Sequence, residues 1–177
     1  MKFFYTDYSF TILDYICTIK KREIVYEWVL PFLLALVVYL KVSDIPGIKI
    51  NSEFIKSILS VLINLFAILV GFAMAAIAIF ATADVTKIPI LQNLSDRTIR
   101  GDRIKNYRFV FLNLIYSAIS CLFMLLVTLF ITIFLYFDKF LLLILAFLTF
   151  GTMHVLLLSI RNITILYFIF FNKEWHS

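Results

Sequence analysis

The sequence predicts an all-α integral membrane protein with four transmembrane helices, on the strength of its composition and of its apolar runs. Hydrophobic residues make up 63% of the 177 residues, charged residues make up 15%, and the mean hydropathy is +1.03. A soluble domain carries about 25% charged residues, and a chain this short has too little interior to bury so many apolar side chains. Four apolar runs are long enough to cross a bilayer, so the solvent of this chain is lipid.

The predicted spans are about 24–40, 57–83, 109–137 and 140–171. The first span is the least apolar because it contains Glu27 and Pro31, but Trp28 and Tyr39 near its ends are typical of the two membrane interfaces. As helices, the last two runs measure about 43 and 48 Å, against about 30 Å for the hydrocarbon core. Because the connection at 138–139 is tight, we expect helices three and four to extend into the cytoplasm; strong tilt is the alternative.

The distribution of basic residues predicts the orientation. Of the 16 Lys and Arg residues, eleven lie before residue 24, in the loop 84–108 or after residue 172; four lie on the other side, and Arg161 lies inside a span. The positive-inside rule therefore places both termini and the loop 84–108 in the cytoplasm. The expected organisation is a cytoplasmic amphipathic segment (1–23), a transmembrane domain (24–172) and a cytoplasmic tail (173–177).

The segment 1–23 has an apolar face at helical spacing, formed by Tyr5, Tyr8, Ile12, Ile16 and Ile19. This pattern predicts an amphipathic helix that either lies on the cytoplasmic leaflet or packs against the extended helices.

No catalytic or metal-binding motif is present, so we expect no enzyme, cofactor or metal. The candidate functional residues are instead polar side chains inside the apolar spans, where lipid makes them costly. Arg161 and Glu27 are expected at similar depth, and we predict that they pair as an interhelix lock or as part of a gate. Alternatively, Arg161 extends to lipid phosphates. His154 is either a packing residue or a proton sensor.

Two further spans carry patterned faces. The third has a polar stripe that either lines a narrow water path or bonds to neighbouring helices. It contains Asn113, Ser117, Ser120, Cys121, Met124, Thr128 and Thr132. The second has a small-residue packing seam, within or between subunits, formed by Ala67, Gly71, Ala75 and Ala78. Asn64, one turn earlier, is predicted to be a hydrogen-bonded core residue.

The loop 84–108 is long for a simple connection and has a net charge of +3. Ser95 or Asp96 is a candidate cap of a short helix within it. We predict a docking surface for a cytoplasmic protein, lipid headgroups or nucleic acid, in that order. Its basic residues are Lys87, Arg97, Arg100, Arg103, Lys105 and Arg108.

The layout and three segments, AILVGFAMAAIAIFATAD, RIKNYR and FGTMHVLLLSIRN, resemble small four-helix membrane subunits of bacterial anti-phage systems. Two such families are the membrane subunit of the Kiwa defence pair and the membrane protein of Rex-type phage exclusion. The resemblance implies a homo-oligomer in the bacterial inner membrane, with a tetramer as the expected form. A Kiwa-like protein detects membrane disturbance by phage and holds a soluble DNA-binding partner on its cytoplasmic face. For this chain we expect no direct binding of nucleic acid. A Rex-like protein opens an ion path.

We therefore expect a membrane-embedded sensor and scaffold of an anti-phage complex that docks a soluble cytoplasmic effector. The long fourth helix and Arg161 depart from the Rex-like pattern and favour this function. The alternative is an oligomeric ion-conducting effector whose stripe at 113–132 faces a central axis and whose opening depolarises the membrane. A small-solute transporter that uses Glu27 as a coupling carboxylate is less favoured, because Glu27 lies near the membrane edge.

Overall fold

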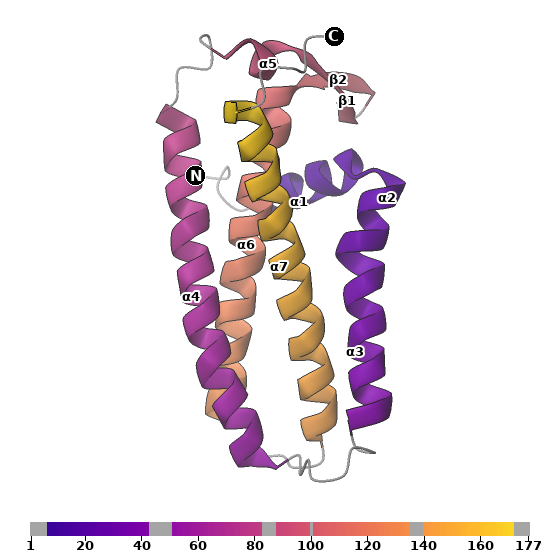
Figure 1. Ribbon diagram of the computed structural model, residues 1–177, viewed down its shortest axis with the longest axis vertical. Coiled ribbons are helices and arrows are strands. Elements are labelled where there is room, and N and C mark those ends of the chain that lie inside the picture. The colour runs from indigo at the N-terminus through magenta and orange to yellow at the C-terminus, as the bar shows by residue number, and fades with distance from the viewer. Residues whose placement is uncertain (1–6, 43–50, 83–87, 100, 135–139, 172–177) are drawn as a thin grey trace.

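The computed structural model describes residues 7–42, 51–82, 88–99, 101–134 and 140–171. It is mostly helical, and its long helices run side by side (Figure 1). The first long helix, Lys21–Lys41, consists of α2 (Lys21–Ile24), the π-helical segment η1 (Val25–Val29) and α3 (Leu30–Lys41). The others are α4 (Ser52–Thr82), α6 (Asn106–Phe134) and α7 (Leu141–Phe171).

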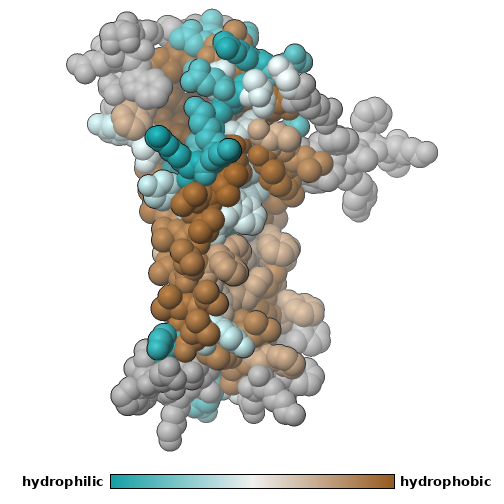
Figure 2. Space-filling view, turned by 90° about the vertical axis from the view of Figure 1, so that its right-hand side faces the viewer, coloured by the Kyte–Doolittle hydropathy of each residue, from teal (hydrophilic) through white to brown (hydrophobic). Residues whose placement is uncertain are grey.

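The described residues contain four helices that are long and apolar enough to cross a membrane, as in a multi-pass membrane protein. Figure 2 shows a hydrophobic band over these helices and a hydrophilic cap at one end. The second span begins at Ser52 rather than at residue 57. The Asn51 side chain accepts a hydrogen bond from the Phe54 amide at 2.8 Å, which caps the helix before the apolar run begins. The tight connection at 138–139 lies outside the described residues.

The central pair of helices is α6 and α7, and α4 and α3 flank this pair on opposite sides (Figure 1). At the end of the molecule far from the cap, Ile55 and Leu59 of α4 pack against Leu145 and Leu148 of α7. In the middle, Phe66 of α4 and Met124 of α6 belong to a second buried cluster. The core is therefore a chain of contacts through α4, α6 and α7, with α3 attached at its side.

Shorter elements form a cap at the end where α6 begins and α7 ends (Figure 1). They are α1 (Asp7–Thr18), α5 (Pro89–Gln92) and the antiparallel strands β1 (Leu94–Ile99) and β2 (Asp102–Lys105). The expectation that Ser95 or Asp96 caps a helix is wrong, since both lie in β1. Gly101, at φ 95°, permits the tight turn between the strands, and Ile99 and Ile104 bury against Leu112 of α6.

The amphipathic N-terminal segment packs against α6. Tyr15 is the inward-facing residue, with Ile12 and Ile19 packed beside it, whereas Ile16 is exposed. The apolar face is thus rotated from the predicted one, because a ring at Tyr15 finds a partner ring on α6. Tyr5 lies outside the described residues.

Candidate functional site

Four polar side chains from four elements meet where the cap joins the long helices. Glu27 comes from η1, Arg161 from α7, Tyr15 from α1 and Asn113 from α6. Arg161 Nη1 donates to Oε1 of Glu27, and Tyr15 Oη donates to Oε2 at 2.6 Å. Arg161 Nη2 donates to Tyr15 Oη at 3.0 Å and to Asn113 Oδ1 at 2.7 Å. We call these four residues the inner clasp.

The inner clasp is buried, which makes its charges dependent on one another. The side chains of Glu27 and Arg161 are only 4% and 16% exposed. A buried charge without a counter-ion lowers the stability of the fold, so the burial of each of these two side chains depends on the presence of the other. The structure therefore places Glu27 and Arg161 in the predicted ion pair. Their role as a lock or a gate remains a prediction.

The backbone carbonyl of Glu27 is available for a contact outside its own helix, and the sequence explains why. In an α-helix the Glu27 carbonyl would accept from the amide four residues later, but that residue is Pro31, which has no N–H. The carbonyl instead accepts a hydrogen bond from Nδ1 of His154 at 2.6 Å. Because Nδ1 is the donor, Nε2 is the acceptor for Tyr116 Oη at 3.3 Å. His154 is thus a buried contact between α7, η1 and α6.

Tyr15 of the cap contacts both the inner clasp and Tyr116, the partner of His154. Its ring stacks on Tyr116 with centroids 3.6 Å apart, and the Arg161 guanidinium lies 5.4 Å from its centroid. Burial raises the pKa of the Tyr15 phenol above its ordinary value. The phenol therefore keeps its proton and acts as a donor to Glu27.

One turn before Glu27, a second carboxylate holds the hairpin. Arg97 of β1 forms a two-point ion pair with Glu23, and one of its donors reaches Oε2 at 2.8 Å. The same nitrogen donates to the Thr18 carbonyl at 2.7 Å, and the guanidinium lies 4.8 Å from the Phe109 ring centroid. We call Glu23, Arg97 and the Thr18 carbonyl the outer clasp. The two clasps connect the long helix Lys21–Lys41 to α1, β1 and α7.

The structure separates the members of the predicted polar stripe. Asn113 and Ser117 are buried and Ser120 is half-buried, whereas Cys121 and Met124 belong to the central apolar cluster. Thr128 is buried and Thr132 is exposed, and their hydroxyls donate to carbonyls of their own helix.

The predicted packing seam makes no internal contact of the expected kind. Ala67, Gly71, Ala75 and Ala78 are exposed on α4, so they are not a seam between helices of the same chain. A Cβ atom built on Gly71 meets open space. A seam between subunits stays a prediction. Contrary to the prediction, Asn64 is not a core residue of the single chain: it is exposed, and it has no hydrogen-bond partner among the residues described. These residues lie on the side of α4 that faces away from α6.

The predicted docking residues have different environments. Arg97 is held in the outer clasp, and Arg108 pairs with Asp14 at 3.6 Å. Arg103 and Lys105 are exposed. Lys87 and Arg100 lie outside the described residues. The docking surface that the described part of the chain offers is therefore smaller than the sequence suggested.

Several residues of the site were not identified from the sequence: Tyr15, Glu23, Tyr116 and the pairing role of Arg97. One signal was present, the spacing of Glu27 and Pro31, which frees a carbonyl inside an apolar helix. Among the described residues no group of three His, Cys, Asp or Glu side chains is placed to hold a metal ion. The arrangement can position helices and exchange hydrogen bonds between fixed partners.

No family model matches this chain, and no curated protein or solved structure is found to be similar to it.

Proposed function

We propose that this protein is a membrane-embedded sensor and scaffold subunit of an anti-phage defence complex, in which movement of the first long helix changes the cytoplasmic cap. The observation that supports the proposal best is that Glu23 and Glu27 each form an ion pair with a different part of the molecule. The two carboxylates lie one turn apart on the helix Lys21–Lys41, and they hold different partners. One binds the hairpin, and the other binds the core.

The exposure of α3 supports a sensing role. Its side chains are largely exposed, and it packs mainly along α7. A change in bilayer thickness or lateral pressure therefore acts directly on this helix. Because Glu23 and Glu27 are part of the same helix, its displacement would strain both clasps together and release the hairpin.

The inner clasp is not fully satisfied, which supports a second arrangement close in energy. Asn113 Nδ2 and Arg161 Nε are buried and have no hydrogen-bond partner within the described part of the chain. Unpaired buried donors are costly, so a second arrangement that gives these two atoms partners would narrow the free-energy gap between the closed state and an open one.

The sensing role is tested by a distance measurement between spin labels in nanodiscs. Labels on Asp96→Cys and Ile163→Cys, in a Cys17→Ser background, report the separation of β1 and α7; both positions are exposed. We expect the distance to increase when lysolipid is added to the bilayer. Glu23→Gln should give the increased distance without lysolipid. A distance that does not respond to lysolipid in the protein with an intact Glu23 would contradict the proposal.

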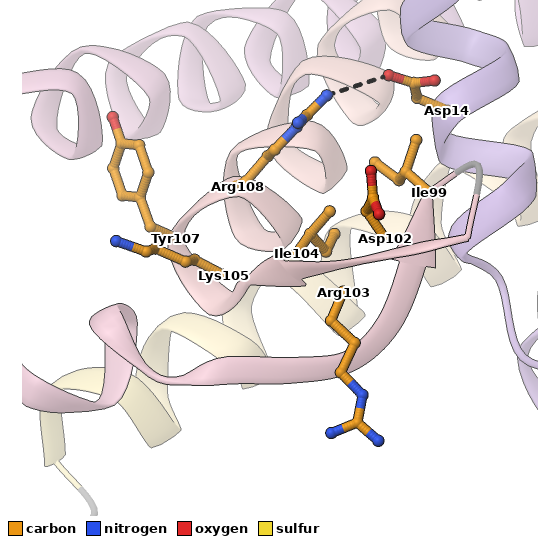
Figure 3. Close-up of a pocket in the computed structure, with 8 residues that line it drawn as sticks. All are labelled: Asp14, Ile99, Asp102, Arg103, Ile104, Lys105, Tyr107 and Arg108. Atoms are coloured by element: carbon orange, nitrogen blue, oxygen red, sulfur yellow. Dashed lines mark ion pairs between the residues drawn. The ribbon is translucent and has the colours of Figure 1, made fainter.

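The resemblance to anti-phage subunits supplies the biological setting, and the cap supplies the surface for a soluble effector. Arg103 is exposed, and its side chain points away from the other residues labelled in Figure 3, which leaves it accessible to a partner. In cells that carry the native locus, Arg103→Glu should abolish protection in a phage plating assay while membrane insertion is retained. Lys56→Glu, at an exposed position near the start of α4 and far from the cap, is the matched control. Full protection by Arg103→Glu would count against this docking surface.

The exposed face of α4 supports assembly with a second copy. Asn64 lies on the same face as Gly71, and an amide is both donor and acceptor, so it can pair with its own copy across a symmetric interface. An unpaired amide in lipid is otherwise costly. We expect Gly71→Leu to shift the protein toward monomer in native mass spectrometry. Val37→Leu on α3, an equally exposed site, should leave the mass unchanged.

Ion conduction has less support. The stripe at 113–132 is divided between the inner clasp, an apolar cluster and hydroxyls bonded to their own helix.

A further inference from the structure

A cavity of about 510 Å³ lies between the hairpin, α1 and the start of α6. Its charged lining residues are Asp14, Asp102, Arg103, Lys105 and Arg108. Neither clasp contributes to it. The cavity is large enough for a small polar molecule or a headgroup.

The cavity carries charges of both signs at separate places. Figure 3 shows Arg108 extended toward Asp14, with Asp102 nearby and Lys105 on the opposite side; Arg103 points away from the others. The Arg108–Asp14 ion pair is 3.6 Å long, and Arg108 is 59% exposed. Asp102 and Lys105 have no ion-pair partner within the described ranges. The site therefore offers a free carboxylate and a free ammonium with a weak pair between them.

The position of the cavity along α6 indicates its surroundings in the membrane. The spanning part of α6, Asn106–Ile133, has 28 residues. As a helix it measures about 42 Å, which matches the about 40–45 Å thickness of a bilayer with its headgroups. A helix of this length can reach from one headgroup layer to the other, which would put its first turn, with Tyr107 and Arg108, at headgroup depth; extension into the cytoplasm would put that turn further out.

We propose that this cavity binds the headgroup of a zwitterionic phospholipid that carries a primary amine, with the phosphate on the side of Lys105 and the ammonium on the side of Asp102, while Arg108 stays paired with Asp14. A purely anionic headgroup would bring its charge close to two carboxylates. A quaternary amine would fill the same space without donating a hydrogen bond to Asp102. The proposal rests on the membrane embedding of the chain and not on movement of the clasps.

The test compares lipids that differ only in the headgroup. The full chain, purified in detergent, is mixed with phosphatidylethanolamine, phosphatidylcholine or phosphatidylglycerol, and the retained lipid is measured by native mass spectrometry. We expect about tenfold higher retention of phosphatidylethanolamine, since it alone of the three can donate a hydrogen bond from an ammonium to the Asp102 carboxylate. Equal retention of the three lipids would overturn the proposal.

Variants at Asp102 and Lys105 test whether the lipid is bound in this cavity. Asp102→Asn should remove the preference for the ethanolamine headgroup, and Lys105→Gln should weaken retention of all three lipids. Both residues are exposed, so the variants should fold, and unchanged unfolding temperatures check this. Arg22→Gln, at an exposed position of α2 that does not line the cavity, is the matched control and should retain phosphatidylethanolamine as before. A loss in this control equal to that in Lys105→Gln would place the lipid elsewhere and overturn the site.

A soluble ligand of the same chemistry is distinguished by competition. Free phosphoethanolamine should not displace bound phosphatidylethanolamine at equal concentration, because it lacks the acyl chains that hold the lipid at this depth. Displacement would overturn the assignment to a lipid. Failure of the label experiment described above would leave the lipid preference intact, so the two proposals are separable.

Discussion

The inner and outer clasps are built from the same chemistry at different depths. Each joins a glutamate of the helix Lys21–Lys41 to an arginine from far along the chain, and each arginine also bonds to α1. The glutamate side chain is 23% exposed in the outer clasp and 4% exposed in the inner one, whereas the arginine side chains are similarly buried, at 11% and 16%. The comparison shows that one ion-pair motif serves two purposes. We expect the outer clasp, whose glutamate is closer to water, to affect mainly the contact with the hairpin. We expect the buried inner clasp to affect the stability of the whole fold.

The largest expected effect comes from breaking the inner clasp. Arg161→Met removes the cation and leaves Glu27 buried without its counter-ion, which should cost about 3–5 kcal/mol of unfolding free energy. Titration with a denaturing detergent, followed by circular dichroism, measures this loss.

The double variant Glu27→Gln/Arg161→Met is the control for this prediction, because it removes both charges and keeps the volume. It should recover most of the lost stability. A single variant as stable as the double one would mean that lipid or water already compensates Glu27.

The Tyr15 hydroxyl should have a smaller effect, because only one of the bonds to Glu27 is lost. Tyr15→Phe keeps the ring stacked on Tyr116 but removes the donor to Oε2. We expect a loss of about 2 kcal/mol, the size of a hydrogen bond to a charged group. The same detergent titration measures it, and hydrogen exchange of α1 should increase while that of α4 stays constant. Faster exchange in α4 would show that the effect is global.

The comparison also shows which parts of the molecule were predictable. The four spans follow from hydropathy, because each helix satisfies its own backbone and needs only apolar side chains to enter lipid. The contact between Glu27 and Arg161 was predictable as well, since both are charges in apolar runs and counting from the connection at 138–139 places them at similar depth. Lipid makes such residues conspicuous.

The outer clasp was not predictable, and neither was the hairpin. Near water, a charged side chain can be solvated or can pair with many different residues at similar free energy. The charges of Glu23 and Arg97 therefore do not indicate that they are partners. The strands β1 and β2 contain few apolar residues, and their pairing depends on the backbone of Gly101 and on the burial of Ile99 and Ile104 on α6. Such contacts depend on the tertiary structure. Tyr15 was missed for the same reason, because its neighbours on α6 and α7 select it over Ile16.

The smallest expected effect, and the one that tests the comparison most sharply, comes from Arg97→Gln in the outer clasp. Glu23, which loses its partner, is 23% exposed, so water replaces much of what the guanidinium supplied, and the global loss should be about 1 kcal/mol. The local effect should be larger: the hairpin is then held mainly by Ile99 and Ile104, so proteolysis in 94–105 should accelerate while the spans stay intact. Arg103→Gln, exposed in the partner strand, should leave the cleavage rate unchanged. If Arg97→Gln instead destabilised the spans as strongly as Arg161→Met, depth would not be the property that separates the two clasps. The hairpin would then be part of the same cooperative unit as the buried core.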